Sequence, residues 1–97
     1  MSERANVFIP QCEGAEQVIQ NVARQFSEEY GGATVRRDHE GYWIDDDGNL
    51  IDDTVDVVFT YGEIDRESLR DIAKQVKQQL DEDAVLTSVE SAETMMV

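Results

Sequence analysis

The densest group of side chains that could bind a ligand is an acidic stretch in the middle of the chain. Between Asp45 and Asp56, seven of twelve residues carry a carboxylate or amide oxygen, the ligand type that Ca²⁺ and Mg²⁺ prefer. The spacing Asp45-x-Asp47-x-Asn49 matches the opening of a calcium-binding loop, but Gly48 occupies its fourth position, whereas such a loop needs glycine at the sixth. Asp56 replaces the bidentate glutamate of the twelfth position. We therefore expect a solvated turn and predict no metal site.

Cys12 and His39 are the single cysteine and the single histidine, the residue types that a thiol nucleophile and its base require. Cys12 precedes a predicted helix, whose positive end can lower the pKa of a thiol. Nothing in the spacing brings His39 to it, because His39 falls within a predicted strand. The sequence also contains no phosphate-binding loop, nucleophile elbow, zinc-ligand pair or dinucleotide fingerprint. We assign no catalytic residue and no cofactor; enzymatic activity stays uncertain, and a non-enzymatic role is favoured.

A strip of basic residues lies on one side of the second predicted helix. Arg66, Arg70, Lys74 and Lys77 are spaced by four, four and three residues, which places them within about 80° of the helix circumference. They carry four of the eight positive charges of the chain. Two interpretations are open. The strip could dock an acidic partner or a phosphate-bearing ligand, or acidic residues three positions earlier, such as Glu63 before Arg66, could neutralise it.

Negative charge dominates the composition. The 97 residues include 22 Asp and Glu against 8 Lys and Arg, a formal net charge of −14. Such a composition is typical of proteins from salt-rich cytoplasm, where the Debye length falls to about 3 Å at 1 M salt. The alternatives are a nucleic-acid mimic, with its carboxylates gathered on one face, and an ordinary acidic protein. Because the acidic residues are dispersed and Lys is scarce, we favour a halophilic organism. Direct binding to nucleic acid or to a membrane is not expected.

The distribution of apolar residues along the chain indicates the cellular compartment. No apolar run approaches the roughly 20 residues of a membrane span, and the start of the chain, Met1–Arg4, lacks the basic and apolar regions of a signal peptide. A single cysteine permits no internal disulfide. We therefore expect a soluble, cytoplasmic protein.

Hydrophobic periodicity predicts the elements that position these residues. Four runs rich in apolar and β-branched residues predict strands: 5–9, 34–44, 54–61 and 84–89. Apolar residues at helical spacing predict helices over 15–30 and 66–80, the first ended by Gly31-Gly32 and the second begun by Asp65 as N-cap. Asp47-Gly48 predicts a hairpin turn. We expect one α+β domain over residues 1–97, with 1–4 and 91–97 frayed.

The element order β-α-β-β-α-β predicts a ferredoxin-like split β-α-β sandwich. In this fold a four-stranded antiparallel sheet carries both helices on one face, and its other face is open to solvent. We expect Phe8, Val58, Tyr42 and Trp43 on the open face. Exposed apolar faces are typical of oligomer and ligand interfaces, so these residues and the basic strip form the predicted interaction surface.

From Gly41 onward the chain carries a recurring set of short motifs. They are Gly41-Tyr42-Trp43, Asp47-Gly48, a strand from Val55 to Tyr61, a helix from Arg66 to Leu80, and Val85-Leu86. In this order they resemble an uncharacterised family of small, mainly bacterial proteins with a Gly-x-Trp-x4-Gly hairpin. Many of those relatives look exported, whereas this chain shows no signal sequence. Because the function of that family is unknown, the resemblance implies a fold and supplies no site.

These observations favour a small non-enzymatic binding or assembly module of a halophilic organism, dimeric through its open sheet face or bound there to another protein. One alternative is an acidic inhibitor, of viral or plasmid origin, that mimics nucleic acid. The other is a small enzyme or ligand-binding protein that uses Tyr42, Trp43 and His39.

Overall fold

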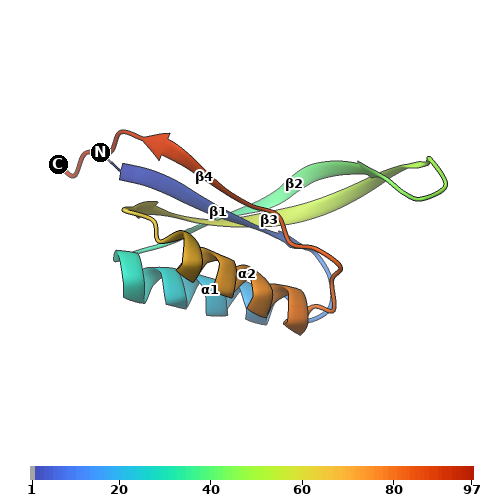
Figure 1. The fold of residues 1–97 in the computed structure, drawn as a ribbon, viewed down its shortest axis with the longest axis horizontal. Coiled ribbons are helices and arrows are strands. Elements are labelled where there is room, and N and C mark those ends of the chain that lie inside the picture. Colours follow the sequence, from blue (N-terminus) through green and yellow to red (C-terminus); the bar gives the residue numbers. More distant parts are fainter. Residues whose placement is uncertain (1) are drawn as a thin grey trace.

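The computed structural model describes residues 2–97, which form one antiparallel sheet and two helices. The elements are β1 (Ser2–Pro10), α1 (Ala15–Tyr30), β2 (Thr34–Ile44), β3 (Leu50–Gly62), α2 (Arg66–Gln79) and β4 (Thr87–Ala92). The strands lie in the order β2-β3-β1-β4, and every neighbouring pair is antiparallel. Both helices cover the same face of the sheet (Figure 1). The predicted α+β, ferredoxin-like arrangement is confirmed.

Three strands differ in extent from their predictions. β1 includes Ser2–Arg4 because these residues pair with β3 or β4, and Met1 lies outside the described residues. β3 begins at Leu50, because residues 50–53 pair with residues 41–44 of β2. β4 begins at Thr87 and ends at Ala92, and residues 93–97 have no regular secondary structure.

The helices form where the apolar periodicity places them. Their buried residues, which face the sheet, are Ala15, Val18, Ile19, Val22 and Phe26 on α1, and Leu69, Ile72 and Val76 on α2. Burying one Val, Leu, Ile or Phe side chain contributes roughly 1.5–3 kcal/mol to the stability of the fold. Gly31 ends α1 in a left-handed conformation, φ 92°, and donates its N–H to the carbonyl of Ser27. The carboxylate of Asp65 caps α2 by accepting the N–H groups of Glu67 and Ser68.

The pairing of β1 with β3 decides which side chains enter the core. Ala5, Val7 and Ile9 are fully buried beneath the helices. Val58 pairs with Val7 and belongs to the same core, so the expectation that Val58 lies on the open face is wrong. Phe8 pairs with Val57 on the opposite, open face, as expected for Phe8. The physical reason for the error is that β3 is central and carries apolar residues on both faces, so alternation alone does not show which row meets the helices.

Candidate functional site on the open sheet face

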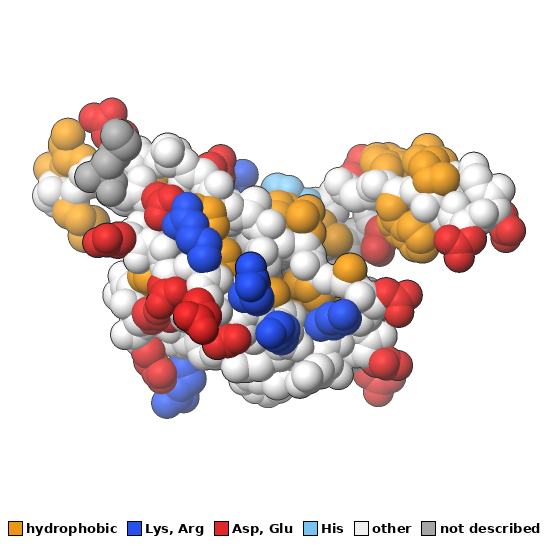
Figure 2. Space-filling view, viewed as in Figure 1, with side chains coloured by type: hydrophobic (Ala, Val, Ile, Leu, Met, Phe, Trp, Pro, Cys, Tyr) orange, Lys and Arg blue, Asp and Glu red, His pale blue; other side chains and the backbone are white. Residues whose placement is uncertain are grey.

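The hairpin of β2 and β3 extends beyond the helices as an arm (Figure 1). We call residues 40–53 the hairpin arm. Its large apolar side chains are mostly exposed: Tyr42 59%, Trp43 53%, Ile44 62% and Leu50 64%. Figure 2 shows apolar side chains gathered on the arm, which projects from the rest of the molecule. With the projecting arm, the molecule is elongated and measures 48 × 24 × 23 Å. Because these side chains are exposed among the residues that the structure describes, they are available for contact.

The acidic tip of the arm is organised as a turn. Asp45 accepts the N–H groups of Asp47 and Asn49 through Oδ1, at 3.0 and 2.8 Å. The Asn49 N–H, with help from the other turn amides, lowers the pKa of Asp45 below its ordinary value. Gly48 supplies the positive φ of 81° that the turn needs. Within residues 2–97, no group of three or more His, Cys, Asp or Glu side chains is placed to hold a metal ion.

An apolar groove of about 640 Å³ runs along the base of the arm. Phe8 and Pro10 of β1, Val55 of β3, Trp43 of the arm and Leu86 before β4 contribute to its lining. Phe8, Trp43 and Tyr42 were all expected on the open face; Phe8 and Trp43 lie there, whereas Tyr42 pairs with Asp52 in the row that faces the helix side, so the expectation for Tyr42 is wrong although Tyr42 borders the groove. The register places Trp43 opposite Ile51 and Tyr42 opposite Asp52, so these two side chains leave the arm on opposite sides.

A β-bulge in β2 sets the polar part of the open face. Arg36 pairs with Val57 and His39 pairs with Val55, so that Arg37 and Asp38 together face the single residue Asp56. Asp38 has a left-handed backbone, with φ 60°. Because of the extra residue, Arg36 and His39 lie on the same, open face although they are three positions apart.

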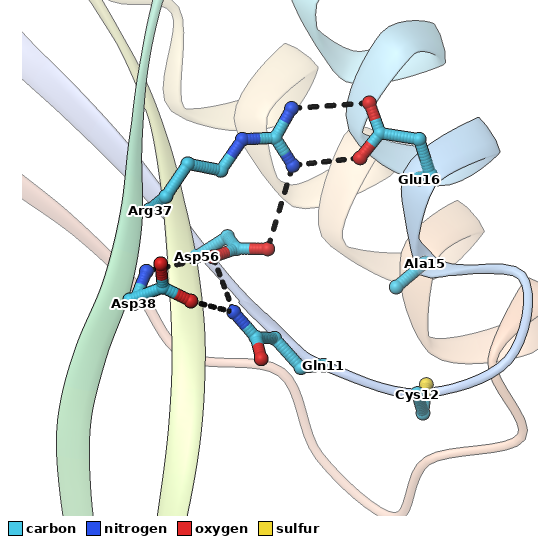
Figure 3. A pocket seen from close by; sticks show the side chains of 7 residues that line it. All are labelled: Gln11, Cys12, Ala15, Glu16, Arg37, Asp38 and Asp56. Atoms are coloured by element: carbon cyan, nitrogen blue, oxygen red, sulfur yellow. Dashed lines mark hydrogen bonds and ion pairs between the residues drawn. The ribbon is translucent and has the colours of Figure 1, made fainter.

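A polar cluster on the helix side supports this bulge (Figure 3). The Asp56 side chain is 5% exposed, and its Oδ1 accepts the Asp38 N–H and the Gln11 Nε2, each at 3.0 Å. Arg37 forms two hydrogen bonds to Glu16, at 2.6 and 3.0 Å, and lies 3.6 Å from Asp56 Oδ2. Burial alone would raise the pKa of Asp56, but the bonds from Gln11, Asp38 and Arg37 outweigh it and hold the pKa below its ordinary value.

Cys12 borders the same cluster but is not activated by it. Burial, reinforced by the charges of Glu82 and Asp53, raises the pKa of the Cys12 thiol. This opposes the lowering that a helix start can produce. Cys12 lines the cavity beside α1, whereas His39 lines cavities on the open face. The structure therefore does not combine Cys12 and His39 into a nucleophile–base pair.

The basic strip on α2 is exposed, and Figure 2 shows Lys and Arg side chains in a row over this helix. Arg66 forms hydrogen bonds to Glu3 of β1 at 2.7 and 2.6 Å, and it does not pair with Glu63. These bonds lower the pKa of Glu3. No ion pair of Arg70, Lys74 or Lys77 is found within residues 2–97. The local neutralisation expected for Arg66 is replaced by a long-range pair, and binding by the strip stays a prediction.

Two features of this region, the polar cluster and the β-bulge, were not predicted from the sequence. The cluster around Asp56 joins Gln11 from the loop after β1, Glu16 from α1 and Arg37 from β2, and the bulge interrupts a segment that was predicted as one regular strand. The sequence carries a weak signal for the bulge. Asp is among the few residue types that tolerate a left-handed backbone, and Asp38 follows two arginines in the strand.

No protein-family model and no curated protein sequence matches the chain. Solved structures do match. The divalent cation tolerance protein CutA1 of Thermus thermophilus superposes with a TM-score of 0.69 at 12% identity, over 99% of this chain and 88% of that one. CutA1 of Oryza sativa superposes with a TM-score of 0.68 at 12% identity, over 98% of this chain and 83% of that one. The likeness is one of fold.

An enzyme is also among the similar structures. A phage SAM lyase in complex with S-methyl-5′-thioadenosine superposes with a TM-score of 0.68 at 12% identity, over 92% of this chain and 80% of that one. The same architecture therefore occurs in proteins with different roles, and the fold alone assigns none of them to this chain. Within residues 2–97, no helix has both the length and the apolar character needed to cross a membrane.

Proposed function

We propose that this chain is a small non-enzymatic assembly module that forms a homodimer through the hairpin arm and the adjoining open sheet face. The observation that supports this most directly is the exposure of four large apolar side chains on the two sides of the arm, Trp43 on the open side and Tyr42, Ile44 and Leu50 on the other. Exposing these apolar side chains to water is unfavourable, and their burial in an interface would remove that cost. Clustered apolar exposure of this kind is typical of interfaces.

A second copy is the occupant that fits the surface best. The arm offers protruding apolar side chains, and the groove at its base, bordered by Phe8 and Val55, offers an apolar recess of about 640 Å³. One chain thus carries both complementary surfaces, which a two-fold dimer uses twice. A stable interface needs about 800 Å² from each partner, roughly an eighth of the 6724 Å² surface of this chain.

The structural neighbours give partial support to a non-enzymatic role. The CutA1 proteins are named for divalent cation tolerance and not for a catalysed reaction. The phage SAM lyase is an enzyme with the same fold, so the argument rests on the arm of this chain and not on the neighbours. Cys12 and His39 line different cavities, so these two residues are not combined as a nucleophile and its base.

The proposal includes a salt-rich cytoplasm as the working environment. Five of the 22 acidic side chains form ion pairs within residues 2–97. The others face water or accept hydrogen bonds, and at low salt their mutual repulsion acts against folding and against association. Apolar contact through the arm would be little weakened when charge interactions are screened.

Sedimentation velocity in about 2 M KCl, where charge repulsion between copies is screened, tests the dimer. We expect the unaltered chain to sediment as a dimer. The double variant Trp43→Ser/Leu50→Ser should sediment as a monomer, because each lost apolar contact contributes roughly 1.5–3 kcal/mol. The matched control is Met95→Ser/Met96→Ser, which removes two exposed apolar side chains from the C-terminal segment. Monomers of the unaltered chain at high protein concentration, or equal dissociation of the control, would contradict the proposal.

A further inference from the structure

A cavity of about 340 Å³ lies on the open sheet face between β1, β2 and β4. Arg4, Arg36 and His39 line it together with the apolar side chains of Phe8 and Val57. We propose that this cavity binds a small organic oxyanion, a carboxylate or phosphate group joined to an aromatic or apolar body. The volume falls at the lower end of the range of small-molecule sites. This inference goes beyond the proposed assembly and does not depend on it.

The first argument is the state of the two arginines. The Arg36 side chain is exposed, and its guanidinium group forms no hydrogen bond or ion pair within residues 2–97. The guanidinium group of Arg4 is held in place, with its carbon 3.8 Å from the ring centre of Phe59 and its Nε donating to Asn6 Oδ1 at 2.9 Å. The Nη atoms of Arg4 donate no hydrogen bond to any residue that the structure describes. Planar guanidinium groups with free donors are suited to oxyanions.

The second argument is the bulge in β2. In a regular strand, side chains three positions apart point to opposite faces, so Arg36 and His39 would be separated by the sheet. The left-handed Asp38 provides the extra residue that turns both to the open face. The bulge is held from the other side by the buried Asp56 and by Gln11. Bulges that re-aim a side chain are frequent next to binding and active sites.

Charge and lining together define the ligand. Glu90 lies 3.6 Å from Arg4 and offsets one of the two arginine charges, so these three side chains leave one net positive charge at the cavity. This suits one anionic group. Phe8 and Val57 form the apolar part of the lining and suit a ring or a short hydrocarbon. On a chain of net charge −14, the positive charge that remains at this cavity lowers the repulsion that an anion meets there.

Titration of the ¹⁵N-labelled protein with phenyl phosphate and with benzoate, followed by NMR, tests the site. Each probe has a ring and one anionic group, and the pair shows which oxyanion is preferred; benzyl alcohol is the uncharged probe of similar shape. We expect saturable shifts of backbone amides near Arg4, Arg36 and His39, with a dissociation constant of about 1 mM for the better probe. Because Phe8 and His39 line both this cavity and the groove of the proposed dimer, the double variant Trp43→Ser/Leu50→Ser should bind at least as well as the unaltered chain, which separates this site from the proposed dimer.

The variant Arg36→Gln should bind the better probe about tenfold more weakly. Its matched control is Arg70→Gln, which changes the net charge equally and removes an exposed arginine from α2 that has no ion pair within residues 2–97. A second variant, His39→Gln, should weaken binding and leave the fold intact. Shifts scattered over the whole surface, equal weakening by Arg70→Gln, or equal binding of benzyl alcohol would each overturn the proposal.

Discussion

Replacement of Asp56 by alanine tests how much the polar cluster beneath α1 stabilises the fold. The Asp56 side chain is 5% exposed and accepts two hydrogen bonds of 3.0 Å, from Gln11 Nε2 and from the Asp38 N–H. Its second oxygen lies 3.6 Å from Arg37. Alanine removes all three interactions. It also leaves the Asp38 N–H of the bulge without its acceptor.

The contacts of Asp56 set the expected loss in the free energy of unfolding. Hydrogen bonds to a charged group contribute about 1.5–3 kcal/mol each, so two of them set an upper range of about 3–6 kcal/mol. The lower end is appropriate here, because Gln11 keeps its second acceptor, Asp38 Oδ1 at 2.6 Å, and Arg37 keeps Glu16. The Arg37 contact adds little, since that side chain is 46% exposed. We expect a loss of about 3 kcal/mol, which lowers Tm by roughly 12–24 °C in a domain of this length.

Urea unfolding followed by circular dichroism measures this loss. The matched control is Asp52→Ala, which removes one exposed carboxylate from the same strand. The pH dependence provides a further check. Because the folded state lowers the pKa of Asp56, its stabilisation is complete above the unfolded pKa of about 4 and is lost as the pH falls through the lower folded pKa. The reasoning is refuted if Asp56→Ala and Asp52→Ala destabilise within about 0.5 kcal/mol of each other at pH 7.

Two further predictions concern the N-cap of α2 and the response to salt. Asp65→Ala should cost about 1 kcal/mol in urea unfolding, because the Asp65 carboxylate accepts the N–H groups of Glu67 and Ser68; an equal cost for Asp71→Ala, an exposed residue on the same helix, would contradict the capping role. The Tm of the unaltered chain should rise between about 0.1 M and about 2 M KCl as repulsion within a net charge of −14 is screened; a flat or falling Tm would count against the salt-rich environment.

The sequence predicted the helices and the topology well because those features depend on local signals. The structure has α1 at Ala15–Tyr30, the predicted range, since apolar residues such as Val18 and Val22 recur at helical spacing and Gly31 ends the helix. The Asp65 N-cap is likewise visible from residue type and position alone. With six elements in this order, few topologies bury both helices on one sheet. The starts of β1 at Ser2 and of β3 at Leu50 depend on pairing with distant residues. Both strands were therefore predicted too short.

The inner face of β3 could not be predicted because its stabilising partners are distant in the sequence. The row containing Val57 and Phe59 is the more apolar, and we expected it to meet the helices. The row that does so contains Asp56 and Thr60, which are 4% and 3% exposed. Gln11 donates to Asp56, and Thr60 donates to the Gly32 carbonyl at 2.6 Å, so both polar groups are satisfied inside the fold. Periodicity cannot show such satisfaction.

The bulge in β2 links the two faces of the sheet physically. On the helix side, Asp56 fixes the Asp38 backbone and Arg37 bonds to Glu16 at the start of α1. On the open side, the same irregularity sets Arg36 and His39 next to each other above Val57 and Val55. A shift of α1 relative to β3 would therefore strain the Arg37–Glu16 bonds and the bulge together, and through them the spacing of Arg36 and His39. The placement of Arg36 and His39 on the open face thus depends on side chains that lie on the helix side of the sheet.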